Sequence, residues 1–357
     1  MEKIKLDDLC VPSARQIKED PDKLIDYIDI ASVDNENKKV TGFQTMSFGE
    51  APSRARKAVK KGSILVSTVR PNLNAVAILE DDTPNVSVAS TGFCILNCKD
   101  NVDNRFVFNF CKSKAFIEDM VSQATGASYP AVSDNIVRSA LVPNYPYEEQ
   151  CHISEILDRV SSAIEKRKVE LAILDDLIKA RFVEMFANWK KKYLAEPLGE
   201  YLQDITYGFT NPMPDAEEGP WKITAKDVVN GIVNLDTARK TLQESYDKLT
   251  EKSKPQLGDV LLTKDGTLGR TAVVEIEGMC VNQSVAVLRI NEKILPKYLS
   301  ILLQMPKYQR DMIADAGGGT IKHIYITKVV KMPIVVPSIE EQNTFLDFVN
   351  QVDKSKV

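Results

Sequence analysis

The chain has 357 residues, 43% of them hydrophobic, and a formal net charge of −4 at pH 7. This length exceeds one ordinary domain and predicts at least two hydrophobic cores. The acidic balance argues against a protein that coats nucleic acid through bulk charge, although it leaves room for local basic patches. No apolar run is long enough to cross a bilayer and the first residues lack a signal-peptide core, so we expect a cytoplasmic protein with no membrane association.

The six cysteines form no CxxC pairs, and only two histidines could join them as metal ligands. In a protein of this size this pattern predicts reduced thiols and no metal site.

The second half of the chain repeats the first at a separation of 192 residues. The tripeptide Glu-Glu-Gln occurs at residues 148–150 and again at 340–342, and Val137 corresponds to Val329. Between such anchors the separation drifts by a few residues, as loops of different length allow. The repeat therefore predicts two copies of one fold.

Each copy has the pattern of an α+β domain, in which short β-rich runs precede one helix and a final strand with a proline. The expected strands are 63–69, 75–79 and 93–96 in the first copy and 259–263, 271–275 and 284–290 in the second; the expected helices are 106–123 and 296–314. We expect globules at residues 1–147 and 191–339, a long helix at 148–190 and a shorter helix at 340–357.

The segment 148–189 predicts one long coiled-coil helix. Alternating steps of four and three residues from Ile153 reach ten seam positions, of which eight are apolar. No proline or glycine interrupts the segment, which would span roughly 63 Å at 1.5 Å per residue. The two polar seam residues, Arg167 and Arg181, are interpreted as places where the seam opens to solvent, with setting of the register as the alternative.

The repeat of this helix has 18 residues, from 340 to 357. If the two helices are antiparallel, its apolar positions should cover Leu174, Ile178 and Met185. The earlier seam positions would then have no partner within the chain and would bind a second copy or another protein. These positions are Ile153, Leu157, Val160 and Ile164.

Signatures of catalysis are absent from the sequence. The glycine-rich segment 264–271 has the wrong spacing for a nucleotide-binding phosphate loop. The segment 211–214 (NPMP) lacks the adjacent second proline and the aromatic residue of amino-methyltransferases, and we interpret it as a turn. A self-sufficient methyltransferase or nuclease is therefore disfavoured, and we assign no catalytic residue.

Four features point to a known family: the doubled globule, the Glu-Glu-Gln at the start of each helix, the segment LAILDDLIKARFVEMF at 171–186, and GDVLL at 258–262 with VNQSV at 281–285. In these features the chain resembles the specificity subunit of type I restriction-modification enzymes. The shorter second helix departs from the pattern of that family. The resemblance implies two target-recognition domains that each read half of a bipartite site in double-stranded DNA, and helices that dock methyltransferase (M) subunits. It also implies that this chain has no cofactor, because the M subunits use S-adenosylmethionine and the restriction (R) subunits use ATP.

Candidate DNA contacts are polar and aromatic side chains in loops next to the expected strands. In the first copy they are Arg70, Asn72, Asn74, Ser128 and Tyr129; in the second they are Tyr207, Thr210, Lys264, Thr267, Lys322, His323 and Tyr325. For each residue the alternative is a structural role, with tyrosines packed in a core and lysines solvated. The basic cluster at 54–61 has the same two interpretations.

A cytoplasmic coiled-coil adaptor with two protein-binding globules would explain the long helix and the acidic charge equally well. A basic surface on the same side of both globules would favour DNA binding over this alternative.

Overall fold

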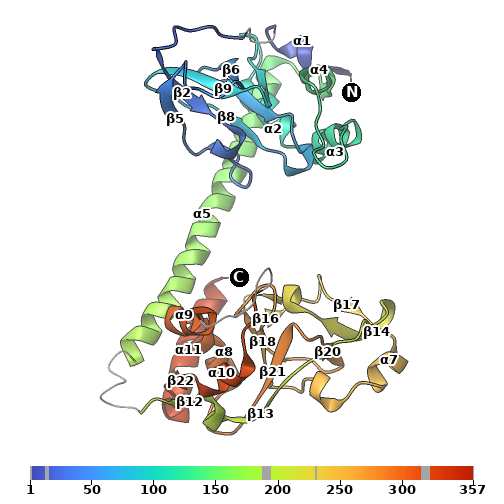
Figure 1. The fold of residues 1–357 in the computed structure, drawn as a ribbon, viewed down its shortest axis with the longest axis vertical. Helices are drawn as coiled ribbons and strands as arrows, with labels where there is room; N and C mark the ends of the chain where they lie inside the picture. Colours follow the sequence, from blue (N-terminus) through green and yellow to red (C-terminus); the bar gives the residue numbers. More distant parts are fainter. Residues whose placement is uncertain (1, 13–15, 187–193, 230, 315–321, 357) are drawn as a thin grey trace. The chain divides into compact units, whose positions relative to one another are not determined.

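The computed structural model describes residues 2–12, 16–186, 194–229, 231–314 and 322–356. Its contacts divide the chain into two compact units, Met1–Arg167 and Lys168–Val357. The long helix α5 (Tyr147–Phe186) is continuous; its first part belongs to unit 1 and its last part to unit 2 (Figure 1). The last residues of the predicted helix, 187–189, lie outside the described residues.

Unit 1 contains two sheets and a two-stranded ribbon. One sheet has the strand order β10-β7-β8-β4-β3, the other has the order β5-β2-β9-β6, and β1 pairs with β11. The strands are β1 (Lys3–Lys5), β2 (Leu24–Ile28), β3 (Val33–Asp34), β4 (Lys39–Val40), β5 (Gln44–Ser47), β6 (Ala55–Ala58), β7 (Ile64–Ser67), β8 (Val76–Ile78), β9 (Val86–Ser90), β10 (Phe93–Leu96) and β11 (Leu141–Pro143). The helices before α5 are α1 (Leu6–Leu9), α2 (Asn104–Cys111), α3 (Lys114–Ser122) and α4 (Asp134–Ser139), with the 3₁₀ turns η1 (Ile30–Ser32) and η2 (Pro71–Leu73).

Unit 2 contains sheets of order β13-β21-β18-β19 and β17-β14-β20, and the pairs β15-β16 and β12-β22. The strands are β12 (Glu196–Pro197), β13 (Leu202–Tyr207), β14 (Ala216–Ile223), β15 (Val228–Val229), β16 (Ile232–Val233), β17 (Arg239–Lys240), β18 (Val260–Thr263), β19 (Thr271–Val273), β20 (Met279–Val281), β21 (Val285–Ile290) and β22 (Pro333–Ile334). The helices are α7 (Gln243–Asp247), α8 (Pro296–Gln304), α9 (Pro306–Ala314), α10 (Ile326–Lys331) and α11 (Ile339–Ser355), with η3 (Leu198–Tyr201), η4 (Ala225–Asp227) and η5 (Glu251–Ser253).

The two units share the pairing of their central strands, which confirms that the chain repeats one fold. The antiparallel order β10-β7-β8 of unit 1 recurs as β21-β18-β19 in unit 2. The parallel pair β2-β9 recurs as β14-β20, and the ribbon β1-β11 recurs as β12-β22. Strand β13 pairs along β21 in unit 2, whereas the equivalent segment of unit 1 makes a single bridge between Cys10 and Cys98.

The helix predicted after the strands is two helices in each unit, so the prediction of one helix is wrong. In unit 1 the chain breaks between α2 and α3 at Ser113, whose side chain caps the second helix by accepting a hydrogen bond from Phe116 N at 3.2 Å. In unit 2 the second helix begins at Pro306, which has no N–H to continue the preceding helix.

Helix α11 packs antiparallel on the end of α5 within unit 2, as the seam predicts. The ring of Phe345, near the start of α11, lies 5.6 Å from the ring of Phe182 and 5.9 Å from that of Phe186 (centroid distances). Lys356, just after the end of α11, lies 2.7 Å from Asp175. The expected partners Leu174, Ile178 and Met185 lie in the same apolar cluster.

The unpaired stripe on α5 is shorter than expected. Ile153 packs against the core of unit 1, formed by the buried faces of β7, β8 and β10 with α1 to α4, so the expectation that it has no partner is wrong. The other three seam residues are exposed: Leu157 by 39%, Val160 by 50% and Ile164 by 54%. The neighbouring Ile156 is exposed as well. The repeat alone could not predict the packing of Ile153, because it depends on contacts with distant segments.

Candidate nucleic-acid interface

The same two chain segments meet in each unit, and together they carry most of the candidate DNA contacts. One segment follows strand β7 or β18, and the other precedes helix α4 or α10. In unit 1 the backbone N of Val132 donates to the carbonyl of Thr68 at 2.8 Å; in unit 2 the backbone N of Ile324 donates to the carbonyl of Lys264 at 2.8 Å. We call these places bridged site 1 (residues 68–74 with 128–132) and bridged site 2 (residues 264–267 with 322–325).

An arginine and a tyrosine are stacked at bridged site 1. The guanidinium carbon of Arg70 lies 4.8 Å from the ring centroid of Tyr129, which is 59% exposed. The backbone N of Arg70 donates to the carbonyl of Pro130 at 2.7 Å, which ties the two segments together. Asn72 and Ser128 are exposed in the same segments. The stacking orients a cationic, planar donor group at an accessible surface.

Asn74 has a structural role in bridged site 1. Arg70 and Asn74 flank the turn η2 and both have left-handed backbone, with φ of 48° and 46°. The side chain of Asn74 is buried, and its Nδ2 donates to the carbonyl of Cys111 at 2.9 Å. Its own carbonyl accepts a hydrogen bond from Lys38 Nζ at 2.6 Å. Asn74 therefore holds the loop in place, which does not fit the solvent-facing role expected of it.

The carboxylate of Asp265 contacts two of the candidate residues at bridged site 2, Lys264 and His323. Asp265 Oδ2 lies 2.8 Å from Lys264 Nζ, and its Oδ1 lies 2.6 Å from His323 Nδ1. The side chains of Lys264 and Asp265 are each 17% exposed, whereas that of His323 is 45% exposed. Lys264 Nζ also lies 5.4 Å from the ring centroid of Tyr207. Three candidates from distant parts of the sequence thus meet here, together with Asp265, which the sequence analysis missed.

The remaining candidates of unit 2 lie around bridged site 2. Tyr207 and Thr210 line a cavity of about 440 Å³, to which Lys248 and Lys252 also contribute. Tyr325 is half exposed, and Lys328 Nζ lies 5.7 Å from its ring centroid. The other two candidates, Thr267 and Lys322, are exposed. These positions leave the polar groups of the loops accessible to a ligand.

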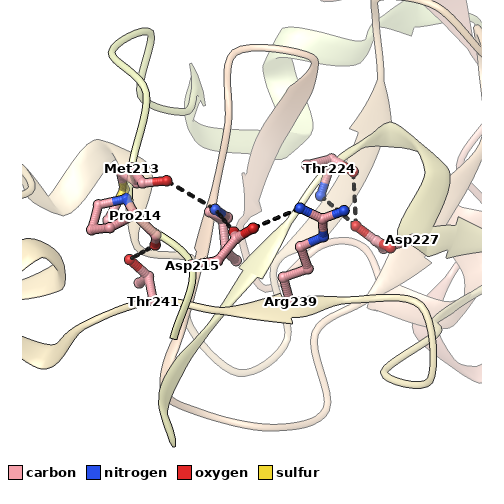
Figure 2. A network of polar contacts seen from close by, with 8 residues as sticks. Met213, Pro214, Asp215, Thr224, Asp227, Arg239 and Thr241 are labelled. Atoms are coloured by element: carbon pink, nitrogen blue, oxygen red, sulfur yellow. Dashed lines mark hydrogen bonds and ion pairs between the residues drawn. The ribbon is translucent and has the colours of Figure 1, made fainter. Parts of the chain in front are cut away.

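A second polar network in unit 2 fixes the segment before strand β14 (Figure 2). Asp215 accepts hydrogen bonds from Lys222 and from Arg239 Nη1, the latter at 2.6 Å, and these bonds lower the pKa of Asp215. Lys222 Nζ also donates to the carbonyl of Met213 at 3.0 Å, and Thr241 Oγ1 donates to that of Pro214 at 2.9 Å. The segment 211–214 has no helix or strand and is anchored by these bonds, so Lys222 and Arg239 serve the fold.

Three of the five basic residues at 54–61 form ion pairs with carboxylates of unit 1, including Lys61 with Asp81 at 3.1 Å. Arg54 Nη2 lies 2.7 Å from Asp29, and Lys57 Nζ lies 2.5 Å from Asp134. The structural interpretation of this cluster therefore fits better than a patch of unpaired positive charge.

Neither a metal site nor a membrane span is found in the described part of the chain. No group of three or more His, Cys, Asp or Glu residues there is arranged to hold a metal ion. None of the helices described is both long enough and apolar enough to cross a bilayer.

Solved structures share this fold. A chain from a structure of the complex assembly and conformational transition of a type I R-M system matches with a TM-score of 0.55 and 22% identity, covering 99% of this chain and 90% of the other. The S subunit of a type I restriction-modification system from M. genitalium matches with a TM-score of 0.52 and 16% identity, again covering 99% and 90%.

Curated proteins with similar sequences are specificity subunits. The specificity subunit of the type I restriction enzyme EcoBI of Escherichia coli is 23% identical over 287 residues, which are 71% of this chain and 60% of that protein. A putative type I restriction enzyme specificity subunit of Haemophilus influenzae is 23% identical over 267 residues, which are 72% of this chain and 66% of that protein. The chain thus spans only about two thirds or less of the length of these relatives.

A family model described as the type I restriction modification DNA specificity domain matches residues 1–173 and 211–357. These ranges include the strands and helices of unit 1, most of unit 2 and both bridged sites. The chain therefore belongs to the family of type I restriction modification DNA specificity domains.

Proposed function

We propose that this chain is the DNA-recognition subunit of a type I restriction-modification system and carries out no catalysis itself. The observation that carries the proposal is the recurrence of the bridged site in both units, each time with exposed polar and aromatic side chains. A repeated recognition surface suits a bipartite site in double-stranded DNA, with each unit reading one half. The family of the chain supports DNA as the ligand.

In unit 1 the proposed reading residues are Arg70, Asn72, Ser128 and Tyr129. Arginine binds guanine through two hydrogen bonds in the major groove, and asparagine binds adenine in the same way. Stacking on Tyr129 limits the orientations of the Arg70 guanidinium, so less conformational entropy is lost when Arg70 binds a base.

In unit 2 the proposed reading residues are centred on Lys264 and His323. Asp265 orients both and also offers carboxylate oxygens, which accept hydrogen bonds from the amino group of cytosine. Other residues around the site would contact either bases or phosphates: Tyr207, Thr210, Thr267, Lys322 and Tyr325.

The exposed stripe Leu157, Val160 and Ile164 on α5 is the proposed docking site for a methyltransferase subunit. Exposed apolar residues that are aligned on one helix face favour a protein partner over solvent. In this assignment S-adenosylmethionine is bound by the methyltransferase and ATP is used by the restriction subunits. Self-association of the chain through the same stripe is the alternative outcome.

A titration of labelled duplex DNA tests the proposal. A subunit with a net charge of −4 neutralises few phosphates by itself, so we expect weak binding by the purified chain. Addition of a methyltransferase subunit of the same restriction-modification system should make binding tight and sequence-specific. A duplex without the recognised site serves as the control. Equal affinity for both duplexes, with and without the methyltransferase, would contradict the proposal.

A further inference from the structure

Cys10 and Cys98 face each other across two antiparallel segments of unit 1. The backbone N of Val11 donates to the carbonyl of Asn97 at 2.8 Å, and the backbone N of Lys99 donates to the carbonyl of Leu9 at 3.0 Å. These bonds flank the cysteines, which therefore occupy a non-hydrogen-bonded pair of the ladder. In such pairs the Cα atoms are about 4.5 Å apart, within the range of about 4.4–6.8 Å that a disulfide requires.

The two thiols also affect each other's pKa. A hydrogen bond from the Cys98 thiol lowers the pKa of Cys10; burial opposes this effect, and the positive charges of Arg138 and Lys99 reinforce it. The same hydrogen bond raises the pKa of Cys98. Cys10 is therefore the sulfur of the pair that more readily becomes a thiolate, the nucleophilic form.

The nearby cysteines are poorer nucleophiles. Burial raises the pKa of Cys94 to about 12 and raises that of Cys111 well above its ordinary value. All six cysteines lie in the described residues and are free thiols. Cys10 is buried, but Cys98 is partly exposed, so a small oxidant can approach the pair.

The fold does not require thiols at these two positions. At the repeat separation of 192 residues, Cys10 corresponds to Leu202 and Cys98 to Ile290, and these two residues pair in the same way between β13 and β21. The second unit thus fills the equivalent place with an apolar pair that cannot be oxidised. This pair supplies a control substitution that the fold already accommodates.

We propose that Cys10 and Cys98 are an oxidation site, at which hydrogen peroxide forms a reversible disulfide across the ladder. The Cys10 thiolate attacks one oxygen of the peroxide, the O–O bond breaks, and hydroxide leaves as Cys10 becomes a sulfenic acid. The Cys98 sulfur then attacks the Cys10 sulfur, and its proton leaves with the sulfenic hydroxyl as water. The two sulfurs lose two electrons in total, and the peroxide is reduced to two waters once hydroxide takes up the proton given up by Cys10.

The disulfide would fix the N-terminal segment of unit 1 to the end of β10. This segment also forms the ribbon β1-β11 and the hydrogen bond from Leu6 N to the carbonyl of Ala140 at 2.9 Å. Oxidation would therefore slow the local unfolding of β11, the strand that leads into helix α5. A dithiol reductant would reverse the effect by thiol–disulfide exchange.

Peptide mapping of the native full chain tests the proposal. After treatment with hydrogen peroxide and alkylation under denaturing conditions, we expect a peptide linked through Cys10 and Cys98, two hydrogens lighter than the sum of its parts. The alkylation of both residues should be lost together and restored by dithiothreitol, while Cys94, Cys111 and Cys280 remain alkylated.

Two variants complete the test. The double variant Cys10→Leu with Cys98→Ile copies the pair of unit 2 and should show no link and no change in hydrogen exchange with peroxide. The variant Cys151→Ser removes another partly exposed thiol and should form the link as the wild type does. The proposal is overturned if Cys10 and Cys98 stay alkylated at peroxide doses that oxidise a free thiol peptide, or if either becomes sulfonic acid or joins another cysteine instead.

Discussion

Gln150 and Gln342 make the same two hydrogen bonds in the two units. The side-chain oxygen of Gln150 accepts from the backbone N of Asp103 at 3.1 Å, and that of Gln342 accepts from the backbone N of Leu295 at 2.8 Å. Each side-chain nitrogen donates to the carbonyl five residues upstream, at 2.8 Å and 2.9 Å respectively. Asp103 and Leu295 are the N-cap residues of α2 and α8, so each buried glutamine joins the starts of two helices.

Replacing either glutamine by alanine should destabilise its own unit. The substitution leaves a backbone N–H and a carbonyl without their partner in a buried place, which costs about 1–3 kcal/mol for each such group. Hydrogen exchange should show faster opening of α8 in Gln342→Ala and of α2 in Gln150→Ala. Gln351→Ala, at an exposed position of α11, is the matched control. If all three variants exchange at the same rate, the glutamines do not have this role.

Asp26 should make unit 1 sensitive to acid. Burial alone would raise the pKa of Asp26, but hydrogen bonds from Thr45 and Asn85 outweigh it, and the pKa is lowered. A group whose pKa is lower in the folded state stabilises the fold above its unfolded pKa. That stabilisation is lost as the pH falls below about 4 and through the folded pKa.

The variant Asp26→Asn tests this dependence by unfolding at a series of pH values. At pH 7 we expect it to be about 1–3 kcal/mol less stable than the wild type, because the amide replaces a carboxylate oxygen that accepts hydrogen bonds. The difference should shrink on acidification. Asp22→Asn, at an exposed position, should follow the wild type. A constant difference from pH 7 to pH 3 would show that the charge of Asp26 does not contribute.

The double variant Leu157→Glu with Val160→Glu should lose its protein partner. Two charges in the exposed stripe of α5 would have to be desolvated on binding, which should weaken association by about 2 kcal/mol or more, roughly 30-fold. Mass in solution, alone and with the methyltransferase, measures the effect. Ser162→Glu adds a negative charge at an exposed position that faces away from the stripe and should bind normally. Wild-type behaviour of the double variant would exclude the stripe as an interface.

The sequence repeat and the helix seam predict which residues of the two units correspond and which helices pack together. The separation of 192 residues makes Gln342 the counterpart of Gln150 in the repeat, and the seam predicts that α11 covers Ile178. Such features follow from the repeat and from the apolar periodicity of the helices, both of which can be read from the order of residues.

Contacts between distant segments could not be predicted in the same way. Asp265 was missed because its partner His323 is far along the chain, and nothing in the glycine-rich segment marks the carboxylate as a link. Asn74 was placed on the surface because a polar residue in a loop is usually exposed, whereas its bond to Cys111 buries it. The break between α2 and α3 has a local signal in the sequence, because Ser113 is a preferred N-cap residue.

The pattern of DNA methylation in cells tests whether each unit reads its own half-site. The methylated positions in host DNA should be mapped for strains that carry the wild type, Arg70→Ala, Lys264→Ala or, as an exposed control, Lys293→Ala. We predict that Arg70→Ala relaxes the preference in one half of a bipartite site and Lys264→Ala in the other half, each by about 1–3 kcal/mol, while the control changes neither. Relaxation of the same half by both variants, or a uniform loss of methylation over all sequences, would contradict the claim that each unit reads its own half-site.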